Sequence, residues 1–507
     1  MDAFIIRGGK PLRGTVRING SKNASLPLMA AALLTTEPVT LRGVPDLSDI
    51  RNMKRLLVSL GLSFDGSDPP SPASPSPKPP DQPGVPLPTP PASQTEKQDP
   101  RYSGLTELIK DRKKPSAQAD PTVAEPEPPA AGSVPSAAAT SASTNITTID
   151  AGKTLAHYDI VRTMRAGICV LGPLLAARGE ARVSLPGGCA IGDRPVDLHV
   201  RGLKALGAQI TLDEGYIIAK PPAGGRLKGT TVFLGGPNGS TVLGTANVLC
   251  AAVLAQGTTV IESAACEPEI ADLCSLLIKM GAQIQGAGTP RLTIDGVDKL
   301  HGAEHDVLPD RIEAGTYVMA AAITGGDVTL DNFPTDALLA ANDRLNEMGI
   351  TLDPTDGSDK PGLRDSVRVV TPRVFQPVQV VTQPHPGFPT DLQAQLMALL
   401  TLADGNSIVT EKIFPDRFLH VAELLRMGAN ITRVGNSAVI TGVRQLYGAP
   451  VMASDLRASA GLVIAGLAAR GTTTINRVYH LDRGYQQMEK TLQGLGADIE
   501  RVKDASV

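Results

Sequence analysis

The sequence is poor in aromatic residues. Phenylalanine, tyrosine and tryptophan together make up 3% of its 507 residues, and tryptophan is absent. This scarcity weakens any interpretation based on the stacking of aromatic rings against sugars or nucleobases. The formal net charge of −3 also gives no reason to expect the basic surface that nucleic acids require. We therefore predict no nucleic-acid partner.

Cysteine is scarce and irregularly spaced. The five cysteines are odd in number and none belongs to a Cys-x-x-Cys motif, which argues against both a disulfide framework and a zinc site. We predict no metal site and a reducing, cytoplasmic setting. The cysteines are Cys169, Cys189, Cys250, Cys266 and Cys274.

Long hydrophobic runs are missing as well. No apolar run reaches the roughly 18 residues that a membrane-spanning helix needs, and the opening segment MDAFIIRGGKPLRG has no apolar core of signal-peptide length. We expect no contact with a membrane. An apolar content of 42% and a charged content of 20% are typical of a globular protein, and the length allows two or more domains.

One pattern recurs six times along the chain. Each instance has an amphipathic helix, a Leu-Gly or Met-Gly pair and then a short strand, and each glycine suits the left-handed position that ends a helix. A second, more uniformly apolar helix precedes each instance, so we expect helices packed inside a ring of sheets. Six units of strand, helix, strand, helix and hairpin predict an α/β fold with two domains of three units each. The repeat glycines are Gly61, Gly207, Gly281, Gly349, Gly428 and Gly496.

The first two repeat glycines are about twice as far apart as the others because a proline-rich segment, residues 66–143, lies between them. Nineteen of the 42 prolines fall between Pro69 and Pro135. Such a segment buries too little apolar surface to offset its ordering entropy, so we predict a solvated spacer inserted at a hairpin turn. A protein partner binding at Arg101–Lys114, which has weak amphipathic character, is the alternative.

The segment SLPGGCAIGDRPVDLH, residues 184–199, carries the most distinctive chemistry. Cys189 follows two glycines, which allow the backbone to approach a ligand closely. Arg194 is suited to holding a phosphate, and a nearby cation lowers the pKa of a thiol and makes it reactive. On these residues alone, an incidental thiol and a catalytic one both stay open.

Seven motifs in order resemble those of the enolpyruvyl transferase family, in its UDP-N-acetylglucosamine 1-carboxyvinyltransferase branch. The resemblance covers nearly the whole chain except the proline-rich segment. It implies a two-domain inside-out α/β barrel of six βαβαββ repeats. Residues 22–308 would form the domain with the Cys189 loop, and residues 1–21 with 309–507 the second. Besides that loop, the motifs are SKNASLP, TMRAGICVLGP, FPTDLQAQ, IFPDRFLHV, SDLRASAGLV and HLDRGYQQME.

The resemblance implies transfer of the enolpyruvyl group of phosphoenolpyruvate to the 3′-hydroxyl of UDP-N-acetylglucosamine, which begins peptidoglycan synthesis. Phosphate would leave by addition and elimination through a tetrahedral intermediate, with no metal or organic cofactor. Asp391 would accept the hydroxyl proton, Cys189 would protonate the methylene carbon, and Asp455 would support the developing positive charge. Cys189 would also form covalent adducts with phosphoenolpyruvate and with epoxides of the fosfomycin type.

The binding residues implied by the resemblance form two sets. Cations dominate the first set because phosphoenolpyruvate carries several negative charges, and Lys22 and Arg483 count as catalytic as well. The phosphoenolpyruvate set is Lys22, Asn23, Arg194, Arg457 and Arg483. The UDP-N-acetylglucosamine set is Arg165, Arg194, Pro195, Val196, Asp197, Leu198, Thr241, Val242, Leu243, Asp391, Ile413 and Phe414.

The chain also departs from the family pattern. Gly239 stands where relatives commonly carry lysine, so one nucleotide contact is expected to be missing or supplied elsewhere, and Cys266 stands where many carry arginine. Two alternatives are open to such a chain: the sister transferase acting on shikimate 3-phosphate, and a non-catalytic paralogue that binds a nucleotide sugar. The joint presence of Cys189 and Asp391 argues against the paralogue, because a binding protein needs neither an acid nor a base.

Overall fold

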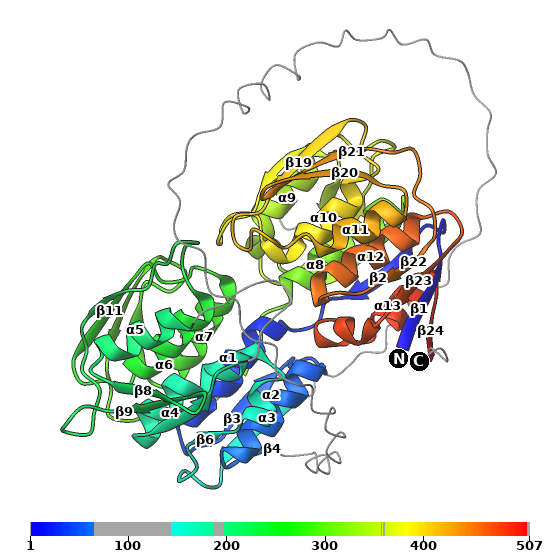
Figure 1. Ribbon diagram of the computed structural model, residues 1–507. Coiled ribbons are helices and arrows are strands. Elements are labelled where there is room, and N and C mark those ends of the chain that lie inside the picture. Colours follow the sequence, from blue (N-terminus) through cyan, green and yellow to red (C-terminus); the bar gives the residue numbers. More distant parts are fainter. Residues whose placement is uncertain (1, 65–142, 187–195, 356, 358–359, 504–507) are drawn as a thin grey trace, which may run out of the picture. The chain divides into compact units, whose positions relative to one another are not determined.

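The computed structural model describes residues 2–64, 143–186, 196–355, 357 and 360–503 (Figure 1). The predicted proline-rich spacer and most of the Cys189 loop therefore lie outside the described residues. Within those residues the strands form six sheets of four strands each. Six sheets match the six repeats predicted from the glycine pattern.

All six sheets share one plan. The first two strands of each sheet run parallel, and the next two complete it in antiparallel pairing. Three sheets come from residues 39–306: β14 (Ala303–Asp306), β3 (Val39–Arg42), β5 (Ser143–Thr148) and β4 (Leu62–Phe64); β6 (Leu155–Ala156), β7 (Ala181–Ser184), β9 (Tyr216–Lys220) and β8 (Gln209–Asp213); β10 (Thr231–Phe233), β11 (Thr258–Glu262), β13 (Arg291–Asp295) and β12 (Gln283–Gln285).

The other three sheets include the two N-terminal strands. β2 pairs in parallel with β15, and β1 lies between β23 and β24. The sheets are β2 (Arg13–Arg17), β15 (Asp327–Phe333), β17 (Asp365–Val370) and β16 (Thr351–Pro354); β18 (Gln379–Val381), β19 (Asn406–Thr410), β21 (Ser437–Thr441) and β20 (Asn430–Val434); β22 (Pro450–Met452), β23 (Thr472–Asn476), β1 (Asp2–Arg7) and β24 (Asp498–Lys503).

The helices alternate between buried and half-buried members. The α-helices are α1 (Lys22–Ala31), α2 (Ser48–Ser59), α3 (Tyr158–Val161), α4 (Leu171–Arg178), α5 (Asp197–Ala205), α6 (Val242–Ala252), α7 (Pro268–Lys279), α8 (Arg311–Ile323), α9 (Leu339–Glu347), α10 (Gln393–Leu400), α11 (Leu419–Arg426), α12 (Leu456–Ala468) and α13 (Met488–Gly494). The 3₁₀ helices are η1 (Ala32–Leu34), η3 (Arg165–Val170), η4 (Asp336–Leu338), η5 (Thr390–Leu392) and η6 (Val478–Arg483).

Each repeat glycine ends a helix in the left-handed conformation. The six glycines have φ between +83° and +101°, and each directly follows the C-cap residue of α2, α5, α7, α9, α11 or α13. Glycine is favoured there because it carries no Cβ to clash in that conformation. The repeat reading of the sequence is therefore confirmed at the level of the backbone.

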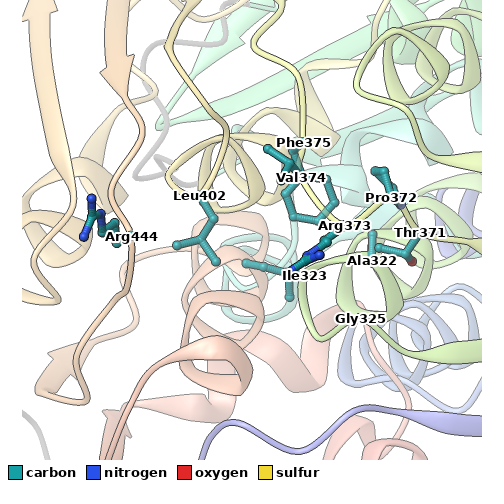
Figure 2. A pocket seen from close by; sticks show the side chains of 10 residues that line it. All are labelled: Ala322, Ile323, Gly325, Thr371, Pro372, Arg373, Val374, Phe375, Leu402 and Arg444. Carbon is teal, nitrogen blue, oxygen red and sulfur yellow. The ribbon is translucent and has the colours of Figure 1, made fainter. Parts of the chain in front are cut away.

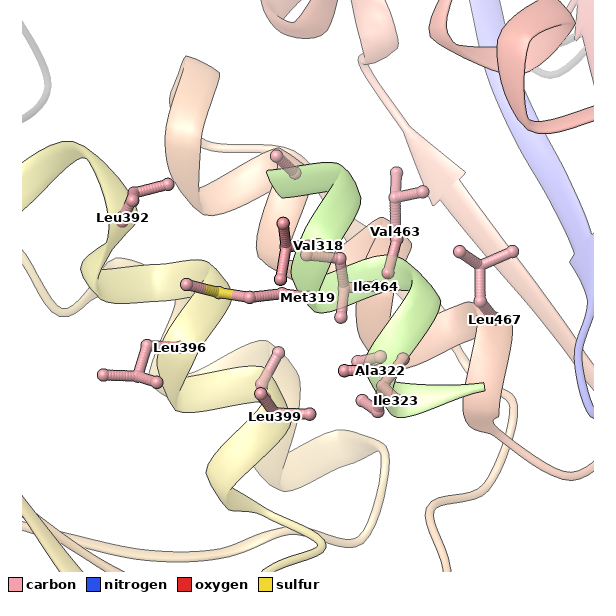
Figure 3. Close-up of a cluster of buried hydrophobic side chains, with 14 of the residues drawn as sticks. Val318, Met319, Ala322, Ile323, Leu392, Leu396, Leu399, Val463, Ile464 and Leu467 are labelled. Atoms are coloured by element: carbon pink, nitrogen blue, oxygen red, sulfur yellow. The ribbon is translucent and has the colours of Figure 1, made fainter. Parts of the chain in front are cut away.

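The inner helices are buried on all sides, as their uniform hydrophobicity predicts. Every residue of α8 and of α10 is buried. Figure 3 shows how α8, α10 and α12 interdigitate, with Met319 of α8 between Leu396 of α10 and Ile464 of α12. The sheets surround these helices, which is the predicted inside-out order.

Buried apolar side chains form two clusters. One cluster draws on residues 24–308, and the other on residues 4–18 together with 312–499. The predicted division into residues 22–308 and residues 1–21 plus 309–507 stays a prediction, and the two clusters follow the same boundaries.

The chain passes between these clusters twice, and the two passages are bonded to each other. Ser21 N donates to Leu308 O at 2.7 Å, and Asp310 N donates to Asn19 O at 2.8 Å. Asn19 also donates from its backbone and its amide to the carboxylate of Glu313, at 2.9 and 3.0 Å. These bonds hold the N-terminus of α1 beside the N-terminus of α8.

Removing residues 68–141 should leave the fold intact. The strands on either side already face each other, since Phe64 of β4 is the register partner of Ile146 of β5. We expect the thermal midpoint of the deletion variant to lie within a few degrees of the full chain, measured by circular dichroism.

A longer deletion supplies the control. Removing residues 68–148 also takes β5, an inner strand of its sheet, and should lower the midpoint strongly. Equal destabilisation by the two deletions would mean that the proline-rich segment contributes to the fold.

Candidate active site

The N-terminus of α1 carries a buried lysine. Ser21 caps the helix by accepting from Ala24 N, and Lys22 and Asn23 form its first turn. Lys22 is 7% exposed, and its backbone N–H donates to Asp310 Oδ2 at 3.2 Å. Burial lowers the pKa of the Lys22 ammonium, and the carboxylate of Asp49 is the main influence in the opposite direction.

Asp49, in the first turn of α2, joins two of the predicted cations. Its Oδ2 lies 3.3 Å from Lys22 Nζ, and its Oδ1 accepts from Arg483 Nε at 3.0 Å. The sequence analysis did not select Asp49. Its position in the first turn of an amphipathic helix gives no signal that separates it from an ordinary surface acid.

The N-terminus of α12 carries a buried arginine. Asp455 caps α12 by accepting from Arg457 N and Ala458 N at 2.8 and 3.1 Å. This gives Asp455 a structural role, and its predicted part in catalysis stays a prediction. Arg457 is 2% exposed and lies over the ring of Tyr485 at 5.3 Å.

The guanidinium of Arg457 has an ion partner but lacks well-aligned hydrogen bonds. Its Nε lies 3.4 Å from Asp391 Oδ2 and the Tyr485 hydroxyl interacts with it, yet none of its three nitrogens has a well-aligned hydrogen bond among the described residues. Leaving a buried donor unsatisfied costs about 1–3 kcal/mol, and more where the group is charged. A buried, under-bonded cation therefore fits the binding of an anionic ligand.

Asp391 lies on η5 between two arginines. Arg417 Nη1 donates to Asp391 Oδ1 at 2.8 Å and to Thr390 Oγ1 at 3.0 Å. Burial alone would raise the pKa of the Asp391 carboxyl, but Arg417 and Arg457 outweigh it and hold the pKa well below its usual range. Arg417 belongs to the motif IFPDRFLHV, but the sequence analysis assigned it no role, so this ion partner of Asp391 was not predicted.

Buried Glu411 organises the neighbouring loop. It accepts from the hydroxyls of Thr382 and Thr390 at 2.7 and 2.9 Å, and from the backbone N–H groups of Ile413 and Phe414 at 2.8 and 3.0 Å. The two predicted nucleotide-sugar residues are thereby fixed on a turn next to the Asp391–Arg417 pair. The sequence analysis did not select Glu411 either.

A second group of predicted residues surrounds α5 and the N-terminus of α6. Val196 and Asp197 begin α5, and the hydroxyl of Thr241 caps α6 by accepting from Gly244 N at 3.2 Å. Leu198, Val242 and Leu243 are half-buried in the first turns of these helices.

His199 and Arg165 adjoin this second group. Asn247 Nδ2 lies 2.9 Å from His199 Nδ1, and the same amide bonds Ile168 O and Gly172 N. Burial, with Arg165 nearby, lowers the pKa of His199 to about 4, so the ring is neutral at pH 7.

Gly239 has a physical reason to be glycine. It closes a tight turn with Gly236 at φ +99°, and a Cβ there would approach Pro384 Cγ to 2.9 Å. Lysine would be strained at this position in this chain. The expected loss of one nucleotide contact stays a prediction.

Three predicted residues lie outside the described residues: Cys189, Arg194 and Pro195. The other four cysteines have raised pKa values, chiefly because of burial. The pKa of Cys169 and that of Cys274 each rise to about 12. Raised pKa values keep these thiols protonated at neutral pH, and the catalytic role of Cys189 stays a prediction.

A cavity of about 280 Å³ lies elsewhere, at the C-terminal end of α8 (Figure 2). Its lining includes Ile323, Phe375 and Leu402 together with Arg373 and Arg444. Cations near the last turn of a helix complement its partial negative charge. None of the predicted site residues lines this cavity, and we assign it no function.

The described ranges of the chain show neither a metal-binding cluster nor a membrane-spanning helix. They contain no group of three or more histidine, cysteine or acidic side chains placed to hold a metal ion. No described helix has both the length and the hydrophobicity to cross a membrane.

Comparison with known proteins places the chain in a family. The profile of the EPSP synthase (3-phosphoshikimate 1-carboxyvinyltransferase) family matches residues 6–68 and 137–492. UDP-N-acetylglucosamine 1-carboxyvinyltransferases from Magnetococcus marinus and Dinoroseobacter shibae are 44% and 48% identical to it. Each alignment covers 99% of this chain and 100% of the relative.

Solved structures agree on the fold. The enolpyruvyl transferase NikO from Streptomyces tendae aligns with a TM-score of 0.75 at 21% identity, covering 99% of each chain. EPSP synthase from Acinetobacter baumannii aligns with a TM-score of 0.66 at 16% identity, covering 99% of this chain and all of the other. The chain belongs to the enolpyruvyl transferase (EPSP synthase) family, in the branch of the UDP-N-acetylglucosamine 1-carboxyvinyltransferases.

Proposed function

We propose that the chain transfers the enolpyruvyl group of phosphoenolpyruvate to the 3′-hydroxyl of UDP-N-acetylglucosamine and releases phosphate. The observation that carries this proposal is the buried, under-bonded guanidinium of Arg457 beside Asp391. The full-length relatives at 44–48% identity support the choice of acceptor. The reaction would begin peptidoglycan synthesis, and the cysteine pattern supports a cytoplasmic location.

Phosphoenolpyruvate would bind to the cations that surround Asp391. Arg457 and Arg483 each act electrostatically on Lys22, and Lys22 and Arg457 both sense Asp391. A phosphate and a carboxylate together would satisfy the N–H groups that Arg457 leaves unpaired. The N-termini of α1 and α12 add partial positive charge at the same place. Asn23, and Arg194 from the undescribed loop, would complete the set.

Asp391 would act as the base, and its partners set its strength. With its pKa held low by Arg417 and Arg457, the carboxylate is ionised but weakly basic. When Arg457 turns to an incoming phosphate or carboxylate, Asp391 loses part of that stabilisation and becomes a stronger base. Substrate binding would thus prepare the proton transfer from the 3′-hydroxyl.

Cys189 would act as the acid that protonates the methylene carbon. The nucleotide sugar would contact the group around Arg165, Asp197 and Thr241 together with the turn at Ile413 and Phe414. A protein partner at residues 101–114 remains a hypothesis about a segment outside the described residues.

The identity of the acceptor substrate tests the proposed function. We expect phosphate release from phosphoenolpyruvate to require UDP-N-acetylglucosamine, measured as inorganic phosphate over time. Cys189→Ala should abolish release at neutral pH, whereas Cys266→Ala, a change at another thiol, should leave it near normal. Release that depends on shikimate 3-phosphate instead would overturn the proposal.

The pH profile tests the role of Arg417. In Arg417→Gln the carboxylate of Asp391 keeps its burial but loses a cation, so its pKa should rise. Because the base must be ionised, the acidic limb of kcat/KM should move to higher pH.

Arg368→Gln is the matched control for this experiment. It removes the guanidinium from an exposed Arg–Asp pair, with Asp327, and should leave the profile unchanged. An acidic limb that stays in place in Arg417→Gln would show that Asp391 does not act as the base.

A further inference from the structure

We infer that Asp49 is a positioning residue of this site, fixing Lys22 and Arg483 as a pair of cations for the phosphoenolpyruvate anion. The inference rests on the proposed function and extends it to a residue that has no assigned role. Asp49 itself would not touch the substrate.

The geometry divides one carboxylate between two cations. Oδ2 of Asp49 lies 3.3 Å from Lys22 Nζ, while Oδ1 accepts from Arg483 Nε at 3.0 Å. The exposed fractions of the side chains are 5% for Asp49, 9% for Lys22 and 34% for Arg483. The acid is therefore the most buried of the three groups, Lys22 is nearly as buried, and Arg483 is the one that reaches toward solvent.

The start of α2 is anchored to the segment that carries Arg483. Ser48 Oγ donates to Asp482 O at 3.3 Å, and Asp46 N donates to Gln486 Oε1 at 3.1 Å. With the Asp49–Arg483 bond, three bonds join residues 46–49 to residues 482–486. Asp49 thus connects α1, α2 and η6 at one point.

The charges around Lys22 explain why this point matters. The groups facing its ammonium are the anions Asp49 and Asp391 and the cations Arg457 and Arg483, and its backbone meets Asp310. Burial and the two arginines all favour the neutral amine, and Asp49 is the strongest influence against it. A neutral amine would lose most of its attraction for phosphate. Asp49 would therefore keep Lys22 charged as well as oriented.

Asp49→Asn keeps the shape and removes the charge. We expect kcat/KM for phosphoenolpyruvate to fall roughly tenfold or more at neutral pH, as for the loss of a charged hydrogen bond. We also expect its alkaline limb to move to lower pH, because Lys22 would lose its proton earlier. KM for UDP-N-acetylglucosamine should stay near the wild-type value.

Three variants separate positioning from packing. Asp49→Glu restores the charge and should restore the alkaline limb, even if Asp49→Asn is poorly folded. In a Lys22→Arg background, Asp49→Asn should not move that limb, because a guanidinium does not titrate there. Asp46→Asn removes an exposed ion pair with Arg51 near the start of α2. This variant should behave as wild type.

Direct binding distinguishes this inference from the proposed function. Calorimetry with phosphoenolpyruvate across pH requires no turnover, and Asp49→Asn should lose binding at lower pH than wild type. Wild-type binding without phosphate release in the presence of UDP-N-acetylglucosamine would contradict only the proposed function. An Asp49→Asn variant with wild-type affinity and pH dependence would overturn only the inference about Asp49.

Discussion

The rest of the site depends on one buried cation. The guanidinium of Arg457 is almost fully enclosed, pairs with Asp391, senses Asp310 and Glu313 electrostatically, and has no well-aligned hydrogen bond among the described residues. A folded chain accepts such a cost only where something else offsets it, and an anionic ligand does so directly. Asp391 shares its charge between Arg457 and Arg417. Any ligand that draws Arg457 away therefore also changes the basicity of Asp391.

The six-fold repetition of the fold creates the conditions for this arrangement. In each repeat an apolar helix enters the interior, so the N-termini of α1 and α12 bring their first-turn residues into buried surroundings. Ser21 and Asp455 cap those helices and so fix where Lys22 and Arg457 begin. The hydrogen-bonded passages around Asn19 and Asp310 then hold α1 beside α8. Lys22 and Arg457, which come from distant repeats, lie close together because the N-termini of α1 and α12 lie close together.

The sequence predicted the repeats and most of the clustered cations, but not the groups that hold them. A glycine at the end of a helix follows a local conformational rule, so the helix ends and the repeats could be predicted from the spacing of these glycines. Lys22, Asp391, Arg457 and Arg483 were found through their motifs. Asp49, Arg417 and Glu411 were missed because their importance lies in long-range partners, such as Asp49 with Arg483, that no local pattern encodes. The same holds for Gly239, whose neighbour Pro384 lies far along the chain.

Replacing Arg457 by methionine tests whether this buried cation holds the substrate anion, with phosphoenolpyruvate affinity and thermal stability measured on the same variant. We expect the affinity, determined by calorimetry in the presence of UDP-N-acetylglucosamine, to fall roughly 100-fold or more. Because the substitution removes one member of a buried ion pair and leaves Asp391 with Arg417, the thermal midpoint of the unliganded protein should fall, so affinity is measured well below that midpoint. A folded variant that keeps its affinity would show that Arg457 does not hold the phosphoenolpyruvate anion.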